Sequence, residues 1–160
     1  MSTINTIILD TMNAMQTLNA TISGMYAPPV EKYPTVIDTA GLPFCLTWPG
    51  EGEAWQKGPG YDQDVMTYRV IVYLDPVAQN DLPVHAVDGA TLLQTVWNLY
   101  VKSANTPLIP GPSPAQVTLQ SGPDGPHMRH GGLVPTLSFG GRGFFGFELQ
   151  IPVRVQWLNP

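Results

Sequence analysis

Two histidines and an aspartate lie within seven residues of one another: Asp124, His127 and His130. Imidazole nitrogens and a carboxylate can together hold a divalent metal ion. The spacing matches no specific metal signature, and a metal site needs a further fixed ligand and partners that orient the ligands. We therefore expect a solvated loop and no metal or other cofactor. A small metal-dependent hydrolase or ligand-binding protein is the alternative function that these residues leave open.

Nucleophilic catalysis would require a thiol or hydroxyl beside a base. Cys45 is the single cysteine, and His85 is a candidate base. Because Cys45 stands between Phe44 and Leu46, we expect it to be a small buried hydrophobic residue instead. A single cysteine also excludes an intrachain disulfide and fits a reducing compartment. The sequence predicts no catalytic residue and therefore no enzyme.

Carboxylates and aromatic side chains are concentrated between residues 51 and 64. The acidic residues of this segment are Glu51, Glu53, Asp62 and Asp64, and its large aromatic residues are Trp55 and Tyr61. Paired carboxylates could serve as a general acid and base. Because nothing in the surrounding sequence indicates a pocket, we expect either a solvated loop or a loop that contacts another protein.

The segment 140–143, Gly-Gly-Arg-Gly, has the composition of a phosphate-binding loop. Such a loop follows a buried strand and opens a helix, so that helical N–H groups point at the phosphate. Segment 140–143 lies between two predicted strands. We expect it to be a turn.

The composition points to one folded domain that carries unusually few charges. The chain has 160 residues, of which 43% are hydrophobic and 12% charged, against about 25% charged in typical soluble domains. The net charge of −5 and the seven basic residues disfavour a protein that coats DNA. Residues 1–10 lack the basic start and apolar run of a secretory signal, and no stretch of 18 apolar residues could span a membrane. We expect a soluble protein, cytoplasmic when it is made.

Two amphipathic helices are predicted. The first covers residues 3–22, where apolar residues recur at spacings of three and four, with Ser2 or Thr3 as N-cap and Gly24 as the stop. The second runs from its N-cap Asp88 to residue 102. Its inward-facing residues are Leu92, Leu93, Val96, Leu99 and Tyr100.

Period-two alternation and turn residues predict six strands. They cover residues 35–39, 43–48, 64–74, 116–120, 133–139 and 144–157, with the first two and the last two pairing as hairpins. Segments 49–60, 106–114 and 121–132 are rich in Gly or Pro and are expected to be loops. The predicted fold class is a single α+β domain over residues 1–160, in the order α-β-β-β-α-β-β-β, with a mixed or antiparallel sheet flanked by two helices.

The last strand alternates over its whole length. Its apolar face carries Phe145, Phe147, Leu149, Ile151, Val153, Val155 and Trp157. A strand of this length would span roughly 40 Å, about twice the usual 17–20 Å, so we expect it to reach beyond its own core. Pro152 cannot donate to a ladder and is expected at an edge or a bulge.

This order of elements resembles that of the tail terminator (tail completion) proteins of long-tailed bacteriophages. The resemblance rests on the apolar stripe of residues 4–22, the strand 68–74, the helix 91–102 and the strand 144–157. It covers nearly the whole chain and is one of pattern and order, without a short invariant motif. Head–tail connector (neck) proteins of the same viruses share much of the pattern and are the alternative.

The resemblance implies a structural virion protein of the tail or neck. It would form a homohexameric ring that closes the tail tube and joins it to the head, after assembly in the host cytoplasm. Its partners would be other copies of itself, the tail tube protein and a head-completion protein, and DNA would pass through the lumen without specific binding.

The candidate sites follow from that role. An acidic lumen would repel DNA, so the lumen or tube-facing candidates are Glu51, Glu53, Asp62 and Asp64. Aromatic anchors often dominate interfaces, and the subunit-contact candidates are Trp55, Tyr61, Glu148, Gln150, Arg154 and Trp157; Trp157 could equally belong to the core. The loops 49–63 and 121–132 are expected to order on assembly.

Overall fold

A computed structural model describes residues 4–37, 41–58, 61–76, 82–103, 107–109, 115–119 and 128–158. Its helices are α1 (Ile4–Asn19), a short 3-10 helix η1 (Val30–Lys32) and α2 (Leu82–Ser103). Its strands are β1 (Phe44–Gly58), β2 (Tyr61–Pro76), β3 (Pro107–Ile109), β4 (Ala115–Leu119), β5 (Arg129–Phe139) and β6 (Arg142–Leu158). The strands form one sheet in the order β1-β2-β6-β4-β3, and β5 also pairs with β6.

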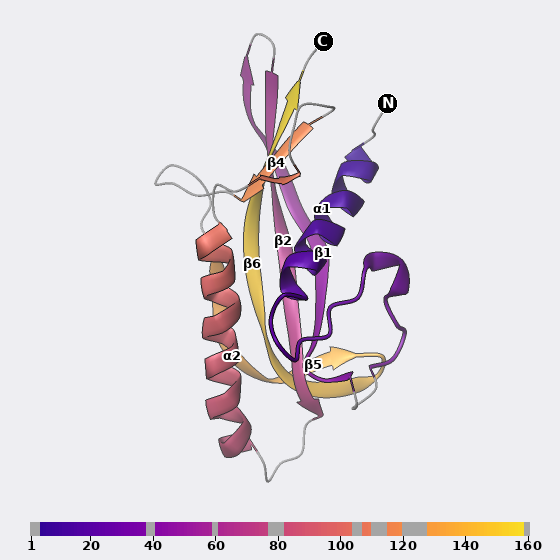
Figure 1. The fold of residues 1–160 in the computed structure, drawn as a ribbon, viewed down its shortest axis with the longest axis vertical. Helices are drawn as coiled ribbons and strands as arrows, with labels where there is room; N and C mark the ends of the chain where they lie inside the picture. Colours follow the sequence, from indigo (N-terminus) through magenta and orange to yellow (C-terminus); the bar gives the residue numbers. More distant parts are fainter. Residues whose placement is uncertain are drawn as a thin grey trace.

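The strand pairings are all antiparallel, and the sheet curls. Figure 1 shows α1 lying across β1 and β2 and α2 running alongside β6. Because α1 contacts both β1 and β3, the two outer strands of the sheet order, it helps to close the curl. The predicted α+β class, with an antiparallel sheet and two flanking helices, is confirmed.

β6 is the central strand of the sheet. One side of β6 pairs with β2 from Tyr61↔Leu158 to Pro76↔Phe144. The other side pairs with β5 as far as Gln150 and with β4 from Val153 onward. Pro152, expected at an edge or a bulge, therefore lies on a central strand, and its register with β2 is continuous through Thr67↔Pro152. Pro152 lies where β6 changes partner from β5 to β4, a position that tolerates a residue without an N–H.

The face of the sheet beneath the helices holds the main core. The predicted apolar face of β6 is buried from residue 145 to residue 155, with Phe147, Leu149, Ile151, Val153 and Val155 all 0% exposed. From the helices, Ile7, Met12 and Met15 of α1 and Val96 and Tyr100 of α2 pack into the same cluster. The side chain of Trp157 lies outside the described residues.

A buried polar network ties the two helices to β1. Gln16 Nε2 donates to the carbonyl oxygens of Pro28 (2.8 Å) and Cys45 (2.9 Å), and Gln16 Oε1 accepts from Thr47 Oγ1 (2.8 Å). Asn19 Nδ2 donates to Gln16 Oε1 (3.2 Å), and the Tyr100 hydroxyl donates to Asn19 Oδ1 (2.7 Å). Burial raises the pKa of Tyr100 well above that of a free phenol, so the hydroxyl keeps the proton it donates. These bonds satisfy polar groups that would be costly to bury alone.

A second, smaller core lies on the opposite face of the sheet. It contains Ile37, Phe44, Leu46, Ile71, Tyr73 and Phe144. The predicted strand 35–39 is wrong over its described part, because residues 35 and 36 form a bend and Ile37 inserts into this cluster at 1% exposure. Residues 38 and 39 lie outside the described part. The predicted hairpin with residues 43–48 is replaced by the pairing of β1 with β2.

The segment 49–60, predicted to be a loop, is extended over its described residues. β1 continues to Gly58 and β2 begins at Tyr61, and the two strands pair with register shifts between Pro49 and Gly52 and between Ala54 and Gln56. A Cβ on Gly50 would lie 2.5 Å from the Thr67 carbonyl oxygen. Glycine is therefore required for close approach of the two strands, and the Gly-rich composition reflects pairing instead of a loop.

Other boundaries also differ from the prediction, and α1 ends at Asn19 instead of residue 22. α2 begins at Leu82, six residues before the proposed N-cap Asp88, and Pro83 occupies its first turn, where proline is tolerated. β3 falls within the predicted loop 106–114, and β5 begins at Arg129 within the predicted loop 121–132. Within the described residues, neither helix is long and apolar enough to cross a bilayer.

Candidate functional site

Most of the predicted contact residues lie on one projecting part of the sheet, which we call the hairpin arm: residues 50–58 of β1 and 61–65 of β2. Figure 1 shows the arm extending past α1, with the C-terminal end of β6 beside it. The structure brings to this arm the positions of Glu51, Glu53, Trp55, Tyr61, Asp62 and Asp64. Their side chains lie outside the described residues, so only their backbone positions are known.

The register aligns arm residues with the end of β6. Asp62 is paired with Trp157 and Asp64 with Val155 of β6. Within the arm, Glu53 of β1 is paired with Val65 of β2. The predicted tryptophan contact and two of the predicted acidic positions therefore lie at one end of the sheet, although they are about 95 residues apart in sequence.

The body of β1 has a capped outer edge. The Cys45 N–H donates to the Tyr26 carbonyl oxygen (2.9 Å), and the Thr47 N–H donates to the Tyr33 hydroxyl (3.0 Å), which donates in turn to the Thr47 carbonyl oxygen (2.9 Å). Burial raises the pKa of Tyr33 to about 12, so the phenol remains protonated and keeps this double role. Such capping protects an edge strand from pairing with another chain.

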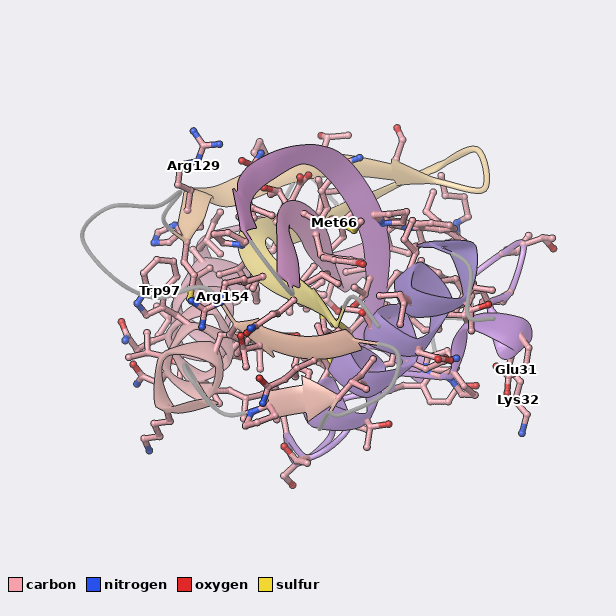
Figure 2. All side chains as sticks on the ribbon, turned by 90° about the horizontal axis from the view of Figure 1, so that it is seen from above. Glu31, Lys32, Met66, Trp97, Arg129 and Arg154 are labelled. Carbon is pink, nitrogen blue, oxygen red and sulfur yellow. The ribbon has the colours of Figure 1, made fainter. Side chains whose placement is uncertain are left out.

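On the open face of the sheet, one line of residues crosses four strands. We call it the arginine row: Trp48 on β1, Arg69 on β2, Gln150 on β6 and Arg129 on β5, each paired in register with the next. Trp48 is 37% exposed, and its ring meets that of Tyr33 edge-on at 5.3 Å. Arg129 Nη2 donates to Gln150 Oε1 at 2.9 Å. The Arg129 side chain points away from the body of the protein (Figure 2).

Glu148 binds Arg69 in a two-pronged ion pair. Arg69 Nε and Nη2 donate to the two carboxylate oxygens at 2.6 and 2.8 Å. Hydrogen bonding to Glu148 raises the pKa of the Arg69 guanidinium, and the two side chains are 47% and 24% exposed. Because the pair is partly solvated, it orients the arginine more than it stabilises the fold.

A hollow of about 380 Å³ adjoins the row. Its lining residues are Arg129, His130, Gly131, Gly132, Val134, Glu148 and Gln150. It forms where the β5–β6 register shifts between His130 and Leu133, and Gly132 has φ +79° there. Two of the three predicted polar contact residues on β6, Glu148 and Gln150, thus line one concave surface. The third, Arg154, is partly buried and paired with Val65 and Thr118, outside the row.

Of the three candidate metal ligands, His130 is the one that the structure describes. The His130 ring meets the Trp97 ring edge-on at 5.1 Å, and His130 Nδ1 accepts from the Gly132 N–H at 3.1 Å. Asp124 and His127 lie outside the described residues. Within the described part of the chain, no three His, Cys, Asp or Glu side chains are grouped so that they could hold a metal ion.

Cys45 is a buried hydrophobic residue, as predicted. It is 0% exposed, and burial raises the pKa of its thiol, which keeps the sulfur in its weakly nucleophilic protonated form. The side chain of the candidate base His85 lies outside the described residues. Gly140 and Gly141 have φ of +57° and +78° and form the turn between β5 and β6, which confirms the predicted turn.

Trp48, Arg69 and Arg129 are the residues of the arginine row that the sequence interpretation missed. Arg69 stands on the polar side of a strongly alternating strand, between Thr67 and Ile71. That position could have indicated an open-face contact. Arg129 was assigned to a loop, so its alignment with Gln150 had no visible signal.

Neither the protein-family models nor the curated proteins that were searched contain a match for this chain. Function must therefore be argued from the surfaces described above.

Proposed function

We propose that this chain is a ring-forming structural subunit of a long-tailed bacteriophage, located where the tail tube ends and meets the head. In this role the chain acts as a tail terminator, and its surfaces bind copies of itself, the tube and a head-completion protein. No step of covalent chemistry is required.

The observation that carries the proposal is the hairpin arm. Two paired strands extend past α1, beyond the layer that the helices cover. The arm concentrates four of the twelve acidic residues of the chain, together with Trp55 and Tyr61. A projecting, twisted pair of strands gains stability when it packs against another surface, and aromatic residues are favoured at such contacts.

The chemistry of the rest of the molecule supports the same role. Charged residues form only 12% of the chain, which suits a subunit whose flanks are covered by neighbours. The described thiol is buried and protonated, and the described histidine His130 is engaged with Trp97 and Gly132. A surface for assembly is thus better supported than a reaction centre.

Electron microscopy of the purified protein, alone and mixed with assembled tail tubes from the same virus, tests the proposal. We expect closed rings with a central opening, either free or seated on one end of each tube. Rings that bind the head vertex in preference to the tube would identify the connector alternative.

The same measurement in the presence of a chelator provides the matched control. Rings should persist with and without chelator, because no metal enters the proposed assembly. A protein that stays monomeric, leaves tube ends bare and binds zinc in a chelator-sensitive way would overturn the proposal in favour of the metal-dependent alternative.

A further inference from the structure

We propose that the acidic hairpin arm of one copy docks on the arginine row and adjoining hollow of the next copy. The inference deepens the proposed function and rests on it, because it names the contact that would hold the ring together. The occupant is a second copy of this chain, and the recognition chemistry is carboxylate against guanidinium.

Charge complementarity selects the occupant. The arginine row carries Arg69 and Arg129, with Glu148 as the carboxylate that pairs with Arg69. Arg129 donates to Gln150, an acceptor without charge, so this partner does not neutralise it. The chain as a whole has a net charge of −5, and the arm carries four carboxylates and one lysine, Lys57. A cationic patch on an acidic protein attracts the acidic part of another copy.

The arm cannot reach the row of its own chain. Asp62 and Arg69 lie on the same continuous strand, β2, seven residues apart, which corresponds to about 23 Å along an extended strand. A rigid strand cannot fold back on itself without breaking its ladders with β1 and β6. The two surfaces can therefore meet only between different copies.

The form of the arm favours docking through side chains over addition of a strand. β1 has register shifts at both ends of residues 49–56 and a proline at residue 49. Bulges and proline are devices that keep an edge strand from pairing with another chain. By contrast, the hollow beside Arg129 is bordered by polar side chains and has a volume of about 380 Å³, enough to admit side chains from outside.

Contact between two different surfaces has a consequence for assembly. When the arm of one copy binds the row of a second copy, the row of the first copy and the arm of the second both remain free. Such a head-to-tail contact propagates until the rotation closes it into a ring. The exposed Trp48 at one end of the row supplies an aromatic residue that can be covered at the same interface.

Reversing charges on each side tests the contact. Asp62→Lys with Asp64→Lys reverses the arm, and Arg129→Glu reverses the row. Each change alone should weaken self-association about tenfold or more, measured by sedimentation velocity, and the loss should shrink at high salt. The chain that carries both reversals should associate again, because a basic arm then meets an acidic row. If wild-type protein associates only on tube ends, occupancy of those ends is the readout.

Lys102→Glu, on the exposed end of α2, is the control with the same change of charge as Arg129→Glu, and it should associate as the wild type does. Circular dichroism must show that every variant is folded.

If each single-reversal variant still forms rings as the wild type does, or if the folded double-reversal variant fails to associate, the docking contact is overturned while the proposed function is left intact. If wild-type protein forms no ring with or without tubes, both proposals fail.

Discussion

The two faces of β6 differ in how their polar groups are satisfied. Toward the helices, Phe147, Leu149 and Ile151 are fully buried, and the nearby polar groups of Gln16 and Asn19 find partners within the chain. On the open face, Glu148 and Gln150 alternate with these residues and line a hollow. The face beneath the helices thus serves folding along the strand, whereas the opposite face adds Phe144 to the second core and leaves the polar groups of Glu148 and Gln150 for contact. The comparison separates changes that should unfold the protein from changes that should affect only its contacts.

The largest effect is expected on the buried face. Phe147→Ala removes a ring that is 0% exposed and should lower the free energy of unfolding by about 3–5 kcal/mol. Urea denaturation followed by circular dichroism measures the change. Leu9→Ala, at a residue that is 48% exposed on α1, is the control and should cost far less. Equal losses at the two positions would show that the helix-covered face does not dominate stability.

Alkaline pH should act on the same face. Burial raises the pKa of Tyr68 to about 12 from 10, so the folded state holds this proton where the unfolded state has released it. The stabilisation is complete below pH 10 and is lost as pH rises toward 12, by up to about 1.4 kcal/mol per pH unit for each such group. Denaturation at a series of pH values checks the sign. Tyr68→Phe should flatten the slope, and an unchanged slope would contradict this assignment.

A smaller effect should come from the buried network. Tyr100→Phe removes the donor to Asn19 Oδ1 and should cost about 1–3 kcal/mol, because the amide oxygen stays buried without that partner. Thermal and urea unfolding would both report the loss. Tyr26→Phe, at a residue that is 50% exposed, is the matched control. If the two changes have the same effect, the network contributes no more than a surface hydroxyl.

The smallest effect on stability is expected on the open face. Glu148→Gln breaks the charge pair with Arg69 but keeps a hydrogen-bond acceptor, so the free energy of unfolding should change by less than about 1 kcal/mol. The same change leaves the arginine row more positive. Self-association measured by sedimentation should therefore strengthen at low salt. Weaker association in a folded variant would show that Glu148 is itself a contact residue.

The sequence predicted those parts of the fold that depend on periodicity. The alternation in residues 144–157 identified the buried residues of β6, and the spacing of Val96 and Tyr100 identified the inner side of α2. It failed where tertiary contacts override composition. The Gly and Pro content of segment 49–60 suggested a loop, whereas Gly50 permits two strands to approach closely. Val36 and Ile37 suggested a strand, whereas the second core draws Ile37 inward.

The candidate site was predictable in composition but not in arrangement. The concentration of carboxylates and aromatic residues in segment 51–64 was evident in the sequence, and so were the polar positions Glu148 and Gln150. The alignment of Trp48, Arg69, Gln150 and Arg129 depends on the register of four strands. Register of this kind follows from pairings between distant parts of the chain, which local patterns do not specify.

Uniform alternation leaves β6 open to a specific folding error. A slip of two residues against β2 would keep every side chain on its proper face, so hydrophobic patterning alone would not reject it. Gly146 provides the missing check, because a Cβ there would lie 2.0 Å from the Val72 carbonyl oxygen. A slipped strand would place Phe144 or Glu148 at that point, and it would also move Pro152 from the gap between β5 and β4. Gly146 thus selects one register with β2 for β6, the longest strand in the sheet.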